Sequence, residues 1–199
     1  IGVYRKCDWV TMTGTASAIT GIILTVNGKT MYAVFCLIFS AICDAFDGVV
    51  ARRFKSLKDY EVYGIELDSL NDAIAFGILP MMITLNICPN SIWLYVICVF
   101  FSIAGIIRLA YFNMLTTTKK GSSKEFIGLP ITASAIIVPL VYFITFLVGK
   151  EYRAIVFPIT LLITGILFIS PFKLKKPSSR EKAALAILGI ISVIVVLLK

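Results

Sequence analysis

The sequence contains no histidine, and only 15% of its 199 residues are charged. The absence of histidine excludes a Ser-His-Asp triad, histidine-based phosphotransfer and a His-ligated zinc site. Five cysteines are present, but they are scattered, odd in number and lack any metal-ligand spacing: Cys7, Cys36, Cys43, Cys88 and Cys98. We expect them to be reduced packing residues.

Apolar residues make up 59% of the chain, and the mean hydropathy is +0.95. This composition is typical of an integral membrane protein. Each apolar segment is near the roughly 20 residues that cross a bilayer core. We predict an all-α fold, a polytopic transmembrane helical bundle of about seven spans (six to eight), forming one domain over 1–199. The predicted spans are 9–27, 30–52, 67–88, 91–115, 128–148, 153–171 and 182–198.

The basic residues are unevenly distributed between the connections. With a cytoplasmic N-terminus, most of the 19 lysines and arginines fall on the inner side, in 52–58, 119–124 and 173–182 among others. The outer side keeps Lys29, Lys150, Arg153 and Lys199. The positive-inside rule therefore predicts a cytoplasmic N-terminus, in the cell membrane if the source is prokaryotic. The net charge of +8 indicates topology and anionic lipid, not nucleic acid.

Four aspartates at the ends of two apolar segments are the most informative feature. Asp44 and Asp47 are three residues apart, and Asp68 and Asp72 are four apart, so each pair shares one face of a helix. A carboxylate near the bilayer core costs about 2.5–3.5 kcal/mol on insertion scales, so intramembrane acids are usually functional. A salt-bridge network with Arg52 and Arg53 is the structural alternative, but the acids outnumber suitable partners.

Clustered carboxylates are the ligands of hard divalent cations. Two such ions clamp a diphosphate and stabilise charge on a leaving phosphate. A carboxylate not fully used by metal can accept a proton from an incoming hydroxyl. These residues alone therefore predict a metal-dependent enzyme that acts on a membrane-embedded phosphoanhydride. We place its site at the cytoplasmic interface, where segment 53–66 joins the two acidic helices.

The spacing of these residues resembles the signature of the CDP-alcohol phosphotransferase family, D-x-x-D-G-x-x-A-R followed by G-x-x-x-D-x-x-x-D. Every fixed position is matched, by Asp44, Asp47, Gly48, Ala51, Arg52, Gly64, Asp68 and Asp72. The resemblance implies that an alcohol attacks the β-phosphorus of a CDP-linked lipid and that CMP leaves. It also implies a homodimer and a pair of metal ions, Mg or Mn, with Ca as a possible occupant.

By position in the signature, Asp44, Asp47, Asp68 and Asp72 correspond to metal ligands, and Asp72 to the general base as well. Gly48, Ala51, Arg52 and Gly64, with Asp44 and Asp68, correspond to the nucleotide and diphosphate site.

Three further segments resemble the phosphatidylserine synthase branch: 66–80, 107–113 and 126–130. They favour transfer of a phosphatidyl group from CDP-diacylglycerol to L-serine, giving phosphatidylserine and CMP. Serine's carboxylate needs a cation, and Arg108 could hold it, with Asn113, Lys119, Lys120 and Lys124 closing over it. Arg108 could equally extend to the interface as a snorkelling side chain.

Two alternatives stay open. The acceptor could be glycerol-3-phosphate or an inositol phosphate, although these anions would demand a more basic pocket than one arginine and a loop. In another class, the protein could be a small cation transporter with the acids as its binding site. A transporter needs acids near the midplane, whereas these lie together at the inner boundary.

Overall fold

The computed structural model describes residues 6–51, 58–118 and 125–175. Its long helices are α1 (Lys6–Val26), α2 (Thr30–Ala51), α3 (Lys58–Asp72), α4 (Leu79–Ile87), α5 (Ile92–Thr118), α6 (Ser134–Val148) and α7 (Arg153–Ile169). A π-helical segment, η1 (Ala73–Ile78), joins α3 to α4, and short 3-10 turns, η2 (Ile131–Ala133) and η3 (Lys150–Tyr152), precede α6 and α7. The fold class is all-α, as predicted.

Six stretches within the described residues are long and apolar enough to span a membrane: Asp8–Val26, Thr30–Asp47, Val62–Ile87, Ile92–Leu115, Ile131–Val148 and Lys150–Ile169. The protein is therefore an integral membrane protein. The predicted seventh span, 182–198, lies outside the described residues.

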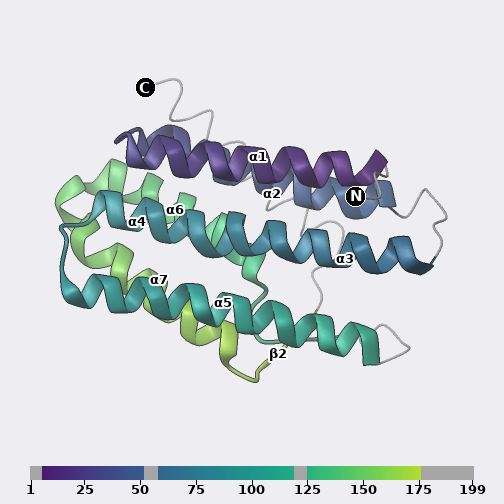
Figure 1. Cartoon of the computed structure of the whole chain (residues 1–199). Coiled ribbons are helices and arrows are strands. Elements are labelled where there is room, and N and C mark those ends of the chain that lie inside the picture. Colours follow the sequence, from purple (N-terminus) through teal and green to yellow (C-terminus); the bar gives the residue numbers. More distant parts are fainter. Residues whose placement is uncertain (1–5, 52–57, 119–124, 176–199) are drawn as a thin grey trace.

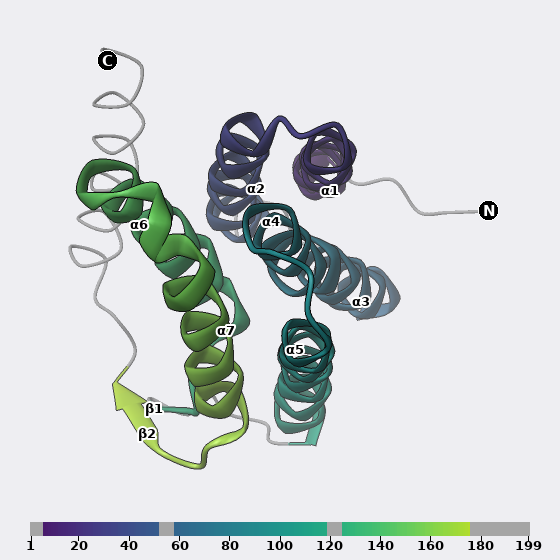
Figure 2. The ribbon, with the colours of Figure 1, turned by 90° about the vertical axis from the view of Figure 1, so that its left-hand side faces the viewer.

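The third span runs through the middle of the bundle as one continuous rod made of α3, η1 and α4 (Figure 1). Viewed along the helices, α1 and α2 lie on one side of this rod and α5 and α7 on the other (Figure 2). The rod also contacts α6. The buried side chains of the rod thus lie among several neighbouring helices.

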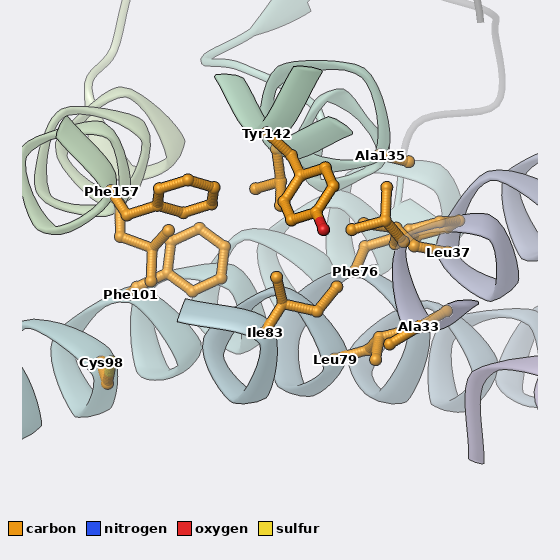
Figure 3. Packing of buried hydrophobic residues seen from close by; sticks show 14 of the residues in the cluster. Ala33, Leu37, Phe76, Leu79, Ile83, Cys98, Phe101, Ala135, Tyr142 and Phe157 are labelled. Atoms are coloured by element: carbon orange, nitrogen blue, oxygen red, sulfur yellow. The ribbon is translucent and has the colours of Figure 1, made fainter. Parts of the chain in front are cut away.

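The buried core surrounds the rod, with Phe76, Leu79 and Ile83 pointing into it (Figure 3). Leu37 from α2, Phe101 from α5 and Phe157 from α7 are also fully buried in this cluster. In a membrane, this core stabilises the fold through close van der Waals packing, because lipid tails are as apolar as the core itself.

Glycines allow some helices to approach closely, as expected for small residues in membrane helices. A Cβ on Gly14 of α1 would come within 3.1 Å of the Cys43 Cβ of α2, and one on Gly21 within 2.9 Å of the Leu79 side chain. Gly77 is different, because a Cβ there would meet nothing nearer than 3.8 Å.

The π-helical segment follows Asp72 directly and has its own polar support. Pro80 has no N–H, so it cannot donate to the carbonyl of Phe76 four residues earlier. The hydroxyl of Ser134 on α6 donates to that carbonyl at 2.9 Å, and Ser102 on α5 donates to the carbonyl of Gly77 at 3.1 Å. These two serines attach the irregular segment to its neighbours. π-Helical turns are frequent at functional sites.

The structure corrects two details of the sequence prediction. The third span begins at Val62 instead of 67, because α3 is already helical from Lys58. Most of the predicted connection 53–66 is therefore helix. In addition, β1 (Glu125–Ile127) pairs antiparallel with β2 (Lys173–Lys175), so two predicted loops are joined by a short strand pair.

Candidate active site

The two acidic helices meet as predicted, with the carboxylates of α2 turned toward those of α3. One carboxylate oxygen from each of Asp44, Asp68 and Asp72 lies within 4.8 Å of the others. The fourth acid, Asp47, is close enough to interact electrostatically with both Asp68 and Asp72. The four predicted acids thus form one cluster between α2 and α3.

Burial of these carboxylates leaves acceptor atoms unsatisfied. Asp72 is only 8% exposed and Asp47 9%. Oδ1 of Asp68 and Oδ1 of Asp72 are buried, and neither has a hydrogen-bond partner within the described part of the chain. A buried acceptor without a donor is costly, and so is mutual repulsion among carboxylates at this distance. A hard divalent cation would remove both costs, so this donor set fits such an ion.

The remaining signature residues flank the acids along the same two helices. Gly48 and Ala51 lie in the last turns of α2, directly after Asp47, and Gly64 lies one turn before Asp68 in α3. This brings the glycine of each helix to the end of the cluster that faces the 52–57 connection. Arg52 lies outside the described residues.

Helix α1 contributes contacts to the site that the sequence prediction missed. The Thr11 hydroxyl donates to Oδ2 of Asp47 at 2.8 Å, in a buried position. One turn further, the Thr15 hydroxyl is 2.8 Å from Oδ1 of Asn71, the residue before Asp72. Asp8, Thr11 and Thr15 are at offsets of 0, 3 and 7, so they share one face of the helix. This polar face was the signal in the sequence from which the contacts of α1 could have been predicted.

Helix α5 flanks α3 on another side. Ser69 and Asn113 bond to each other, with Nδ2 of Asn113 donating to the Ser69 Oγ at 2.8 Å. Further along, Ser102 bonds to Gly77. Arg108 lies between these two contacts on α5, which places it at the depth of Asp72 along the rod. Of the other predicted acceptor contacts, Lys119, Lys120 and Lys124 lie outside the described residues.

Arg108 is a buried side chain with part of its guanidinium engaged. It is 5% exposed, its Nε donates to the carbonyl of Leu129 at 3.1 Å, and its guanidinium lies 5.5 Å from the Phe112 ring centre. It is therefore not a side chain extended to the interface. A guanidinium has five N–H groups, so four remain on its two terminal nitrogens.

The Gly128-Leu129-Pro130 turn holds the carbonyl that Arg108 contacts. Gly128 has a φ of +75°, which favours glycine, and a Cβ there would come within 3.0 Å of the carbonyl oxygens of Phe168 and Ser170. The Leu129 N–H donates to the Leu167 carbonyl at 3.1 Å. The turn is thereby attached to the end of α7, and Arg108 is attached to the turn.

Fold and site together define an integral membrane protein with a buried cluster of carboxylates between its second and third spans. The chain belongs to the CDP-alcohol phosphatidyltransferase family, whose model matches residues 7–168. This match covers α1 through most of α7, so it includes the whole acid cluster and the helices that support it.

Curated relatives include three proteins with related names. The chain is 33% identical over 170 residues to the CDP-diacylglycerol–serine O-phosphatidyltransferase of Methanocaldococcus jannaschii, covering 85% of this chain and 73% of that protein. It is 37% identical over 144 residues to the protein of that name from Helicobacter pylori strain J99, covering 69% and 58%. It is 29% identical over 136 residues to the archaetidylserine synthase of Methanothermobacter thermautotrophicus, covering 68% and 56%. The chain thus spans little more than half of the length of two of these relatives.

Proposed function

We propose that this protein transfers a phosphatidyl group from CDP-diacylglycerol to the hydroxyl of L-serine, giving phosphatidylserine and CMP. Family membership supports the reaction class, and the names of the three relatives agree on serine. The observation that carries the proposal is the cluster of Asp44, Asp68 and Asp72, with its unsatisfied buried oxygens.

We assign Asp44, Asp47, Asp68 and Asp72 as ligands of two divalent ions, Mg or Mn. When bound, such ions neutralise a diphosphate and stabilise the negative charge on the departing phosphate. The protein's part is to hold four carboxylates together at one depth of the membrane. The contacts of the central rod with its neighbours do this, because they keep α2 and α3 in one relative position.

Asp72 is assigned as the general base. Its Oδ1 has no donor among the described residues, so it is available to accept the proton of the serine hydroxyl. As that proton moves, the serine oxygen forms a bond to the β-phosphorus. The bond from this phosphorus to the bridging oxygen breaks, and CMP leaves with the electron pair.

Arg108 is assigned to the carboxylate of serine. Its depth matches that of Asp72, and its two terminal nitrogens suit a bidentate contact with a carboxylate. The bond to Leu129 holds the guanidinium by its Nε edge, leaving the terminal edge toward a ligand. Asn113 lies further toward the end of α5 and is bonded to Ser69, so its part is to orient α5 against α3 beside the acceptor. Lys119, Lys120 and Lys124 follow α5 in the chain and remain assigned to the closing loop.

The nucleotide is assigned to the end of the cluster nearest the 52–57 connection. Gly48, Ala51 and Gly64 lack bulky side chains, so a ligand can lie close to the backbone there. Arg52 would pair with the phosphate charge. We further propose that this end faces the cytoplasm, on the basis of the basic connections, and that the enzyme acts as a homodimer, as the family resemblance implies.

The direct test is CMP release from CDP-diacylglycerol by the purified protein with a panel of acceptors. L-serine should support metal-dependent release, whereas glycerol-3-phosphate and an inositol phosphate should not. CMP release with one of those two anions, and not with serine, would identify that anion as the acceptor. Release without divalent metal would contradict the assignment of the four acids.

A cation transporter is the rival from another class. Its acids would need access from both membrane faces, whereas Asp44 and Asp47 lie in the last turn of the second span. Flux of Mn²⁺ into proteoliposomes, without CMP release under any acceptor, would favour the transporter and reject the enzyme.

A further inference from the structure

The first helix makes a buried hydroxyl contact to the acid cluster. Thr11 donates to Oδ2 of Asp47 at 2.8 Å, and both side chains are buried, at 5% and 9% exposed. Thr11 belongs neither to the family signature nor to any span that carries an acid of the cluster. Its contact therefore links a third helix to the site.

The geometry of α1 keeps this hydroxyl in place. Gly14, one turn after Thr11, allows α1 to approach α2 until a Cβ would be 3.1 Å from that of Cys43. Cys43 is the residue before Asp44. The next residue along α1, Thr15, attaches the helix to α3 next to Asp72 through its contact with Asn71. Helix α1 is thus fastened to both acidic helices, and both attachments lie in the turn that follows Thr11.

A donated hydrogen bond restricts the rotation of a carboxylate. Asp47 has several rotamers on a helix, and the bond to Thr11 favours the one that is observed. A fixed carboxylate orientation favours binding of a cation, and metal-ligating carboxylates are generally supported by such outer contacts.

We propose that Thr11 is a positioning residue for Asp47 and that it raises the affinity of the acid cluster for a divalent cation. The proposal rests on the metal assignment made under the proposed function. It goes beyond that assignment by naming a residue outside the signature and a helix without a metal ligand.

The test measures Mn²⁺ binding to the detergent-purified protein, by the electron paramagnetic resonance signal of free Mn²⁺, without nucleotide or acceptor. Thr11→Val keeps the side-chain shape and removes the hydroxyl. Its dissociation constant for Mn²⁺ should rise roughly ten-fold or more, as for other supporting contacts of metal ligands. Thr11→Ser restores a hydroxyl and should recover most of the affinity.

Thr20→Val is the matched control. Thr20 is an exposed threonine on the same helix, and its hydroxyl bonds to the Ala16 carbonyl within α1. This variant should bind Mn²⁺ like the parent protein. In an Asp47→Asn background, Thr11→Val should cause little further loss, because the residue through which it acts has been changed.

An unchanged Mn²⁺ affinity in Thr11→Val, or an equal loss in the Asp47→Asn background, would overturn the proposal, even if melting temperature fell. Those results would give Thr11 a purely structural role. Parent protein that binds no Mn²⁺ would refute this inference and the metal assignment together. Parent protein that binds Mn²⁺ but transfers nothing to serine would refute the proposed acceptor alone, and the Thr11 comparison would still stand.

Discussion

At the scale of single residues, the burial of Asp72 has the clearest chemical consequence. Its carboxylate is 8% exposed, and its Oδ1 lacks a donor among the described residues. Asp72→Asn keeps the shape of the side chain but removes its basicity. We expect the turnover number for CMP release to fall by about 10²–10⁴, the usual contribution of a general base.

Glu66→Gln provides the matched control for this prediction, since Glu66 is an exposed acid on the same helix. It should retain the turnover of the parent protein. Metal-dependent CMP release at the parent rate by Asp72→Asn would remove Asp72 from the role of base.

Arg108 gives the second prediction at this scale. Loss of a charge-assisted contact to serine's carboxylate costs about 1.5–3 kcal/mol, so Arg108→Ala should raise the KM for serine by roughly 10- to 100-fold. Arg108→Lys keeps the charge but loses the planar fork, so its KM should also rise. Initial rates over a range of serine concentrations measure both.

The KM for CDP-diacylglycerol serves as the internal comparison, and it should change little in both variants. If the Arg108→Ala protein kept the parent's KM for serine, Arg108 would not bind serine. Its role would then be limited to its contact with Leu129. A parallel rise in both KM values would instead indicate displacement of the Gly128–Pro130 turn.

At the scale of elements, the π-helical segment depends on hydroxyls from neighbouring helices. Ser134 donates to the Phe76 carbonyl that Pro80 cannot serve. Ser134→Ala should therefore lower the free energy of unfolding by about 1–3 kcal/mol, the cost of an unsatisfied buried acceptor. Denaturant unfolding in detergent, followed by circular dichroism, measures this difference.

A proline replacement tests the cause of that loss. Pro80→Ala supplies an N–H four residues after Phe76, so Ser134→Ala should cost less in this background. Ser170→Ala is the control, because the Ser170 hydroxyl makes a solvent-exposed bond to the Ile166 carbonyl at the end of α7, away from the π-helical segment. Equal losses in the two backgrounds would show that Ser134 acts through another contact, such as that to the Ile131 carbonyl.

At the scale of the whole molecule, the proposed orientation follows from charge and has its own test. The Asn27–Lys29 turn and the acidic end lie at opposite ends of the bundle (Figure 1). A cysteine introduced by Asn27→Cys should react with a membrane-impermeant maleimide in intact cells. Asn27 is exposed. One introduced by Glu66→Cys should react only after the membrane is opened.

The native cysteines give a low background for this labelling, since Cys43, Cys88 and Cys98 are buried and Cys36 is partly buried. The parent protein, which has no introduced cysteine, is labelled in parallel and measures the contribution of Cys7 to the background labelling. Labelling of Glu66→Cys from outside in intact cells would invert the topology and place the acid cluster on the outer face.

Much of the fold was predictable because hydropathy depends on residue order alone. The six described spans coincide with predicted ones to within a few residues, apart from the early start of the third. That start was missed because residues 58–66 are polar, and polar composition suggests a loop even where a helix continues beyond the membrane core. The strand pair of β1 and β2 joins segments nearly 50 residues apart, which no local pattern indicates.

The sequence by itself determined the acids of the site, because spacing along a helix decides which side chains share a face. It also determined the family, because the signature depends on residue order. Only the tertiary structure decided which helix supports which acid. Thr11 meets Asp47, Ser69 meets Asn113, and Arg108 bonds to Leu129 through contacts between segments distant in sequence. Such contacts depend on the rotation and depth of packed helices, and these are set by the interlocking of whole surfaces, not by local pattern.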